Sequence, residues 1–473
     1  MSDQDLIRNS ACEVVGKLKS GEVTPLDLLD VLEKRIAEVD GKVNALPILC
    51  FGRAREHAEA LMKKPASQRG LLAGLPVPIK DLTAVAGVRT TQGSPIFKDN
   101  IPEHSDILVE RLEDNGAVIY AKSNTPEFGA GANTFNEVFG PTLNPWDTSR
   151  SAAGSSGGAA VALATGTAWL AHGSDMGGSL RNPASFCGVV GLRPSIGRVA
   201  HTPKFKVDRT LGVQGPMARN VEDLALLLDA MSGEHPADPL SLPALPTSFL
   251  SAARSGSKPK RIAYSADLGI TPVDPEVAAI TRKAAERFAE LGAIVEQAHP
   301  DLREAHECFH VLRALDFAVS KAELLRKHRD LLKPEVIWNI EEGLKLTVEQ
   351  VARAEAQRVA LAARAEAFFK TYDLLLAPAT IVPPFPVQNR YVAECAGKKF
   401  DNYVEWLGIV YAITLACCPA LSLPCGFTAS GLPVGLQIVG PSRGEAKLLA
   451  GAKLLEDILG LRGTTPIDPR AAK

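Results

Sequence analysis

Paired cysteines are the first feature that the sequence lacks. Eight cysteines are spread over 473 residues, and none forms a C-x-x-C pair or the close spacing of a disulfide framework. The N-terminus also lacks a positively charged start followed by an apolar core, which is the pattern of a secretory signal. These absences predict reduced, mostly buried thiols and a cytoplasmic protein.

An excess of one charge and an unbroken apolar run are missing as well. The formal net charge is -2, and no cluster of lysine or arginine resembles a nucleic-acid-binding stripe. Pro419 and Pro424 interrupt the apolar run at 409–427, which favours a buried helix–strand unit over a membrane span. We therefore expect a small-molecule substrate, no nucleic acid and no membrane span, and the sequence leaves a homodimer open.

A serine- and glycine-rich segment at 153–181 is the most informative stretch that is present. Ser155 and Ser179 each follow a glycine and lie 24 positions apart. Neighbouring glycines let a hydroxyl and nearby N–H groups approach a ligand closely. The small apolar residues of 159–165 predict a helix, which places Ser155 and Ser156 near a helix N-terminus that favours negative charge. The segment is typical of an oxyanion-binding site.

A serine hydroxyl is a poor nucleophile at neutral pH and needs a positioned base. Lys80 is the candidate, because two prolines and three aliphatic residues precede it and make a rigid, apolar approach. Desolvation there is expected to lower its pKa from ~10.4 toward the ~7 to 8 that suits a general base. Ala168–His172 predicts a buried strand, with residues 173–179 as the loop at its end.

An ordered series of motifs resembles the amidase signature family, with few gaps from about Gly74 to Arg219. The motifs are V-P-I-K-D at 77–81, K-S-N-T-P-E at 122–127, G-P-T-L-N-P-W at 140–146, G-S-S-G-G at 154–158, D-M-G-G-S-L-R-N-P at 175–183, F-C-G-V-V-G-L-R-P at 186–194 and G-P-M-A-R at 215–219. One fragment would be weak evidence, whereas the whole series in order is specific.

The resemblance implies a Ser-Ser-Lys triad in which Ser179 is the acyl-forming nucleophile, Ser155 bridges and Lys80 is the base. It also implies a cis peptide at Gly154–Ser155, an oxyanion hole made by backbone N–H groups of 176–179, and no metal or cofactor. Two residues depart from the family pattern, Ala153 for a glycine and Ser174 for a threonine. The substrate-binding residues implied are Gly129, Ser155, Met176, Gly177, Gly178 and Ser179, with Ser156, Asp175 and Arg181 as supporting residues.

Three rival interpretations of the chemistry compete with the triad. His306, Glu307 and His310 match the H-E-x-x-H zinc motif on a predicted helix, although no third ligand is indicated. Ser156 satisfies G-x-S-x-G, but the nucleophile elbow needs a strand directly before it and 144–150 predicts a loop. Lys122 also follows an apolar run and is a rival base. Asp175 and Arg181 are better interpreted as a charged pair that fixes the loop.

The chain alternates predicted helices and strands, which favours an α/β fold. We expect one large domain, 1–473, with a mixed central β-sheet covered by helices on both faces, as the resemblance implies. Its expected parts are N-terminal helices at about 1–64, the motif-bearing core at 74–219, a largely helical pocket region at about 261–371, and a return to the sheet at 372–473.

The predicted function is hydrolysis of a carboxylic amide or related acyl–nitrogen bond, such as an anilide or hydrazide, through a serine acyl-enzyme. An alternative of a different class is the glutamine-hydrolysing subunit of a tRNA-dependent amidotransferase, which the same family includes. That role requires partner subunits. The third alternative is the zinc hydrolase.

Overall fold

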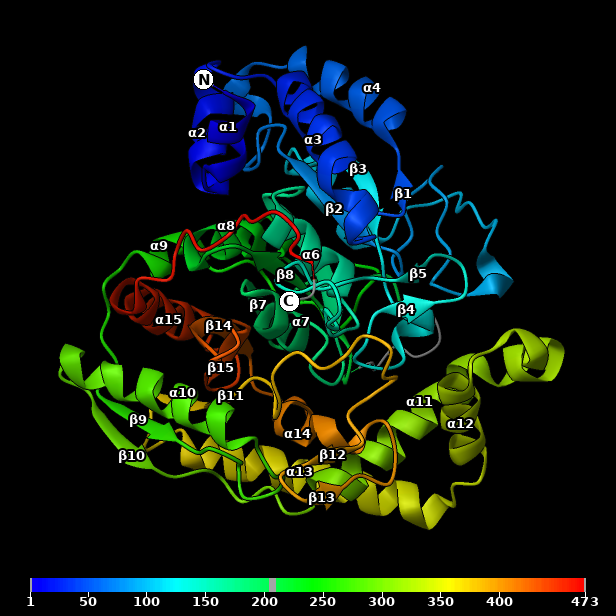
Figure 1. Ribbon diagram of the computed structural model, residues 1–473, viewed down its shortest axis with the longest axis vertical. Helices are drawn as coiled ribbons and strands as arrows, with labels where there is room; N and C mark the ends of the chain where they lie inside the picture. The colour runs from blue at the N-terminus through cyan, green and yellow to red at the C-terminus, as the bar shows by residue number, and fades with distance from the viewer. Residues whose placement is uncertain (1, 204–209, 472–473) are drawn as a thin grey trace.

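The computed structural model describes residues 2–203 and 210–471. Four N-terminal helices lie at the top of the molecule in Figure 1. At the start of α3, Thr24 caps the helix and exchanges hydrogen bonds with Asp27, while Pro25 occupies the first turn. The helices are α1 (Asp3–Arg8), α2 (Ala11–Ser20), α3 (Pro25–Val39) and α4 (Phe51–Met62).

A three-stranded sheet with the order β1-β3-β2 lies beneath these helices (Figure 1). It consists of β1 (Ile48–Leu49), β2 (Pro76–Lys80) and β3 (Val118–Ser123), with α5 (Ile107–Asp114) directly before β3. The apolar approach to Lys80 is thus itself a strand, β2. Within the described residues this sheet shares no ladder with the larger one, so the two are separate sheets.

The large sheet has eight strands in the order β10-β9-β11-β15-β14-β7-β8-β6. The sheet is mixed, because β9 pairs in parallel with β10 and β11, whereas all other strand pairs of the sheet are antiparallel. The strands are β6 (Leu170–Asp175), β7 (Val190–Arg193), β8 (Val213–Ala218), β9 (Arg261–Tyr264), β10 (Ile294–Gln297), β11 (Leu374–Pro378), β14 (Ala420–Phe427) and β15 (Pro433–Val439). The later chain thus returns to the sheet that the central segment begins, as expected for one α/β domain.

Helices cover the large sheet. In one group α15 contacts both α8 and α9, and in another α6 contacts α7. The bounds are α6 (Gly157–Thr165), α7 (Arg181–Cys187), α8 (Val221–Met231), α9 (Phe249–Ala253), α10 (Pro275–Glu286) and α15 (Glu445–Leu459). Short hairpins are formed by β4 (Phe135–Asn136) with β5 (Gly140–Pro141), and by β12 (Glu394–Cys395) with β13 (Lys398–Lys399).

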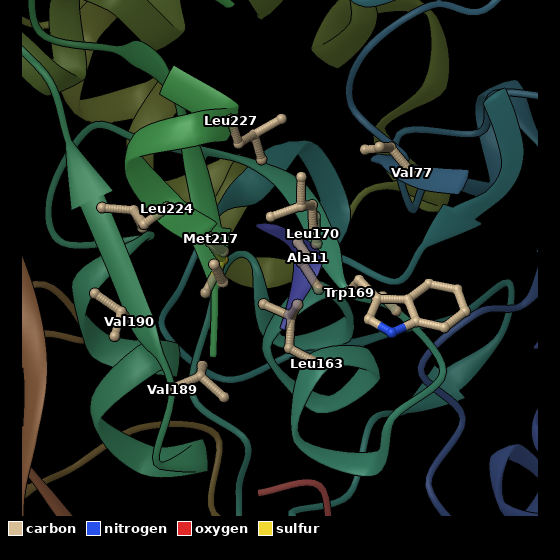
Figure 2. Close-up of a cluster of buried hydrophobic side chains, with 14 of the residues drawn as sticks. Ala11, Val77, Leu163, Trp169, Leu170, Val189, Val190, Met217, Leu224 and Leu227 are labelled. Atoms are coloured by element: carbon tan, nitrogen blue, oxygen red, sulfur yellow. The ribbon is translucent and has the colours of Figure 1, made fainter. Parts of the chain in front are cut away.

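One hydrophobic core joins the two sheets. Figure 2 shows Val77 of β2 in the same buried cluster as Leu170 of β6 and Leu163 of α6. Every residue of α6 is buried, and its small side chains let it contact β2 and β3 as well as β6 and β8. A Cβ on Gly158 would lie 2.3 Å from the backbone nitrogen of Asn124, so only glycine permits this approach. The N-terminus of α6 is thereby fixed beside the ends of β2 and β3.

The middle of the chain forms long helices that lie at the lower right and bottom of Figure 1. They are α11 (Ala305–His328), α12 (Pro334–Leu344) and α13 (Val348–Phe368), followed by α14 (Gly408–Leu415). The apolar run at 409–427 is a buried helix followed by β14, as expected. Within the described residues, no helix has the length and apolarity needed to cross a membrane.

Candidate active site

Lys80 lies at the end of β2 with its side chain fully buried. Its Nζ is 2.8 Å from Ser155 Oγ, 2.8 Å from Ser156 Oγ and 3.0 Å from Ser174 Oγ. Ser155 and Ser156 come from the start of α6, and Ser174 comes from β6. The amine at the end of β2 is therefore surrounded by three neutral hydroxyl groups, two from the start of α6 and one from β6.

Burial lowers the pKa of Lys80 from its ordinary value of 10.5 to about 7, although the charge of Asp175 acts in the opposite direction. A neutral amine has two N–H donors and one lone pair. Ser156 donates its own hydroxyl proton to the Ser174 carbonyl, at 3.3 Å, so its oxygen accepts from Lys80. The lone pair of the neutral amine is then left for a proton from Ser155 or Ser174.

The side chain of His172 bridges the two sheets next to this lysine. Its Nδ1 accepts a hydrogen bond from the backbone N–H of Lys80 at 3.3 Å, and its Nε2 lies 2.8 Å from Gln214 Oε1. An amide oxygen only accepts, so Nε2 carries the proton. Burial lowers the pKa of His172 to about 3, which keeps the ring neutral. The imidazole of β6 thus links the backbone of β2 in the small sheet to Gln214 of β8 in the large one.

A buried ion pair holds the loop that carries Ser179. Arg181 donates to both carboxylate oxygens of Asp175, at 2.9 and 3.1 Å. The same carboxylate accepts from the backbone N–H groups of Gly178 and Leu180. Burial raises the pKa of Asp175, but Arg181 and Arg193 outweigh burial and hold it well below its usual range. The carboxylate stays ionised and fixes residues 176–180.

This arrangement changes the expected set of oxyanion donors. The N–H of Gly178 is already donated to Asp175 at 2.9 Å, so it is not available to a ligand. Among the described residues, no protein acceptor pairs with the N–H groups of Met176, Gly177 and Ser179. A Cβ on Gly177 would lie 2.9 Å from the Phe309 ring, which explains the glycine there. Of the four N–H groups expected as oxyanion donors, three are therefore left to pair with a ligand.

The two family serines open onto the same cavity of about 550 Å³. Ser155, Ser179, Gly129 and Met176 line it, whereas Gly177 and Gly178 do not. The backbone N–H of Ser156 donates to the Ser179 carbonyl at 3.2 Å, which ties the two loops together. The Gly154–Ser155 peptide is cis, as the resemblance implied.

Gly129 packs directly against Ser155. A Cβ at this position would lie 3.3 Å from Ser155 Oγ, and the backbone has a φ of +70°, which favours glycine. The structure therefore brings together Lys80, Ser155, Ser156, Asp175, Ser179 and Arg181 as expected from the sequence. It adds Ser174, noted from the sequence only as a departure in loop shape, and His172, which no sequence pattern indicated.

The H-E-x-x-H residues do not form a metal site. His306 has both ring nitrogens engaged, one by the Tyr411 hydroxyl and the other by the Ile270 carbonyl at 3.0 Å. Glu307 instead accepts hydrogen bonds from Arg353 and Gln357. In residues 2–203 and 210–471 no group of three potential ligands could hold a metal ion. The zinc interpretation is therefore wrong, because the motif residues are used to join helices.

The contacts of Ser156 and Lys122 also argue against the other two rival interpretations. Ser156 contacts Lys80 but does not line the cavity, and the chain before it is a loop rather than a strand. Lys122 Nζ donates to the Thr83 carbonyl at 2.5 Å and lies 3.7 Å from an Asp81 oxygen. Neither residue is placed as a nucleophile or as its base.

Comparison with known proteins agrees with this geometry. The family model described as Amidase matches residues 27–449. An acylamidase of Rhodococcus erythropolis is 36% identical, over 99% of both chains. A glutamyl-tRNA(Gln) amidotransferase subunit of Moorella thermoacetica is 35% identical, over 94% of this chain and 96% of its own.

A solved structure extends the likeness to the fold. A bacterial aryl acylamidase of the amidase signature family superposes with a TM-score of 0.89 at 27% identity, covering 97% of this chain and 99% of that one. The sequence match, the shared fold and the lysine surrounded by serine hydroxyls agree. This chain belongs to the amidase signature family and is an amidohydrolase that acts on amide C–N bonds.

Proposed function

We propose that this amidohydrolase cleaves a carboxylic amide, anilide or hydrazide through an acyl-enzyme on Ser179, with Ser155 as bridge and Lys80 as base. The observation that carries the proposal is the buried amine of Lys80, 2.8 Å from Ser155 Oγ, behind a cavity that Ser155 and Ser179 both line. A pKa of about 7 lets this amine accept a proton at neutral pH.

The proton steps follow from that placement. Neutral Lys80 takes the hydroxyl proton of Ser155, Ser155 takes the proton of Ser179, and Ser179 Oγ forms a bond to the carbonyl carbon. The protons then return through Ser155 to the leaving nitrogen as the C–N bond breaks. Water repeats the sequence on the ester and regenerates Ser179.

Negative charge develops on the carbonyl oxygen during both steps. The N–H groups of Met176, Gly177 and Ser179 are the donors proposed to stabilise it, since Gly178 is committed to Asp175. Each such donor contributes about 10²- to 10³-fold to the rate in other serine hydrolases. Asp175 and Arg181 act by holding these donors in place before substrate binds.

Covalent labelling tests the nucleophile. A serine-directed fluorophosphonate should label the wild-type protein at Ser179, and Ser179→Ala should abolish both labelling and hydrolysis. Ser251→Ala, at an exposed position of α9, is the matched control and should label like wild type. Persistent labelling of folded Ser179→Ala would contradict the assignment.

Substrate preference tests the reaction class. The names of the acylamidase and aryl acylamidase relatives favour acyl anilides as the first compounds to assay, beside simple amides and hydrazides. We expect hydrolysis by the purified chain alone, and unchanged activity after dialysis against a chelator. Loss of activity on chelation, restored by zinc, would contradict a serine mechanism.

The similarity to the amidotransferase protein of Moorella thermoacetica supports a second candidate, glutamine hydrolysis for a tRNA-bound partner. The two functions are separated by one assay. The amidotransferase role predicts ammonia release from glutamine that rises sharply when partner subunits are added. The proposed function predicts anilide hydrolysis without them.

A further inference from the structure

Arg313 of α11 forms part of the cavity wall and is only 8% exposed. Its Nε donates to Asn339 Oδ1 at 3.1 Å, its Nη2 donates to the Tyr403 hydroxyl at 2.9 Å, and its Nη1 lies 3.3 Å from Met176 Sδ. The guanidinium carbon is 4.8 Å from the centre of the Phe317 ring. The group is therefore held in one plane beside the first residue of the Ser179 loop.

No carboxylate of the described residues lies within 4.0 Å of this guanidinium. Other charged groups of the wall have partners of their own: Asp175 pairs with Arg181, and Glu323 pairs with Lys327. Asp316 lies one turn further along α11, outside ion-pair distance of Arg313. A buried charge without a counter-ion is costly, and buried charges in proteins are normally paired.

The hydrogen-bond donors of Arg313 are also only partly used within the protein. A guanidinium has five N–H donors, and three of the Arg313 donors have the acceptors described above, one of which is a thioether, a weak acceptor. Two N–H groups on the terminal nitrogens are left. Adjacent guanidinium N–H groups match the two oxygens of a carboxylate, and water exclusion strengthens that pairing.

We propose that Arg313 is a carboxylate-binding subsite, so that the preferred substrates are amides that carry a carboxylate in addition to the scissile bond. This inference rests on the proposed function, because it names the substrate class of the same cavity. Arg313 and Ser179 line the same cavity, so the bound carboxylate and the reacting carbonyl would belong to one substrate molecule. Asn339 and Tyr403 hold the guanidinium plane toward it.

Two matched pairs of substrates test the proposal. Glutaryl p-nitroanilide and pentanoyl p-nitroanilide differ by a carboxylate on the acyl side, whereas 4-acetamidobenzoate and acetanilide differ by one on the leaving side. In at least one pair, wild-type kcat/KM should favour the carboxylate by roughly tenfold or more. Arg313→Met should bring that ratio close to one, and Arg313→Lys should restore part of it.

Arg326→Gln is the matched control, because it removes a positive charge from an exposed position of the same helix and should keep the preference. Equal kcat/KM within both pairs for the wild type would overturn the subsite. A preference for the carboxylate substrate that survives in folded Arg313→Met would also overturn it, since the positive charge responsible would then belong to another residue.

Binding to the Ser179→Ala protein provides a measurement that needs neither turnover nor a folded Arg313 variant. Calorimetry with both members of each pair should show tighter binding of the carboxylate in the pair that the wild type prefers. If no compound is hydrolysed by the wild type, the proposed function fails, and this calorimetry alone decides the subsite. If the neutral anilides are hydrolysed and neither measurement shows a carboxylate preference, only the subsite fails.

Discussion

Two buried lysines at the ends of neighbouring strands, Lys80 of β2 and Lys122 of β3, have opposite surroundings. Both side chains have no exposed surface. Lys80 meets three hydroxyl groups, whereas Lys122 meets the Thr83 carbonyl, the Thr90 hydroxyl and the Asp81 carboxylate. Burial alone therefore does not make a lysine a base. The partners decide: Lys122 has the Asp81 carboxylate as a counter-ion, whereas the groups that contact the Lys80 amine are all hydroxyls, and that of Ser155 lines the cavity.

The register of the small sheet explains how the two sites stay separate. Lys122 is aligned with Ile79, the residue before Lys80, and Ser123 is aligned with Lys80. Successive side chains of a strand point to opposite faces, so the two lysines leave the sheet on opposite sides. One faces α6 and β6, and the other faces the loop after β2.

The largest effect is expected for Lys80→Arg. A guanidinium keeps positive charge and does not give up its proton, so it cannot act as a base. We expect kcat/KM to fall more than about 10³-fold, close to the loss for Lys80→Ala. Steady-state kinetics on a folded variant decide this. Activity within about tenfold of wild type would show that the lysine acts only through its charge.

Lys122→Met should act on stability instead. Removing one partner of a buried pair costs about 3–5 kcal/mol, because Asp81 is left without its cation. The urea midpoint should fall accordingly, while kcat/KM of the folded protein stays within about tenfold of wild type. The double variant with Asp81→Asn should regain part of the stability. A loss of activity equal to that of Lys80→Arg would contradict a purely structural role for Lys122.

His172→Leu should have an intermediate effect, because it removes the acceptor that holds the Lys80 backbone. We expect kcat to fall roughly tenfold to a hundredfold with a smaller change in KM. His172→Asn places an oxygen near the position of Nδ1 and should recover part of the loss. Equal activity of the Leu and Asn variants would mean that the bridge does not position the base.

The smallest effect concerns the pH profile of the Lys122→Met variant. Wild-type kcat/KM should fall by about tenfold per pH unit below pH 7, because the Lys80 ammonium forms as the pH drops through its pKa of about 7. Since Lys122 lies on the other face of the sheet, its replacement should leave this acid limb in place. A shift of the limb by more than about one unit, or 1.4 kcal/mol, would show that the two sites are coupled.

The sequence determined much of the local structure and the identity of the candidate residues. Small apolar residues marked α6, the alternating pattern marked the return of the later strands, and the ordered motifs singled out Lys80, Ser155 and Ser179. One boundary was wrong, since β6 extends to Asp175 where a loop was expected from 173. The pairing of residues 173–175 with β8 explains the difference, because ladder hydrogen bonds extended the strand.

Only the tertiary structure decided which groups meet. It placed Ser174 and His172 against Lys80, committed the Gly178 N–H to Asp175, used His306 to join helices, and left Arg313 buried at the cavity wall. The physical reason is that a local pattern specifies a strand or a helix through nearby residues. Hydrogen-bond partners and desolvation depend on elements that lie far apart in the chain, and these are fixed only when the two sheets pack around α6.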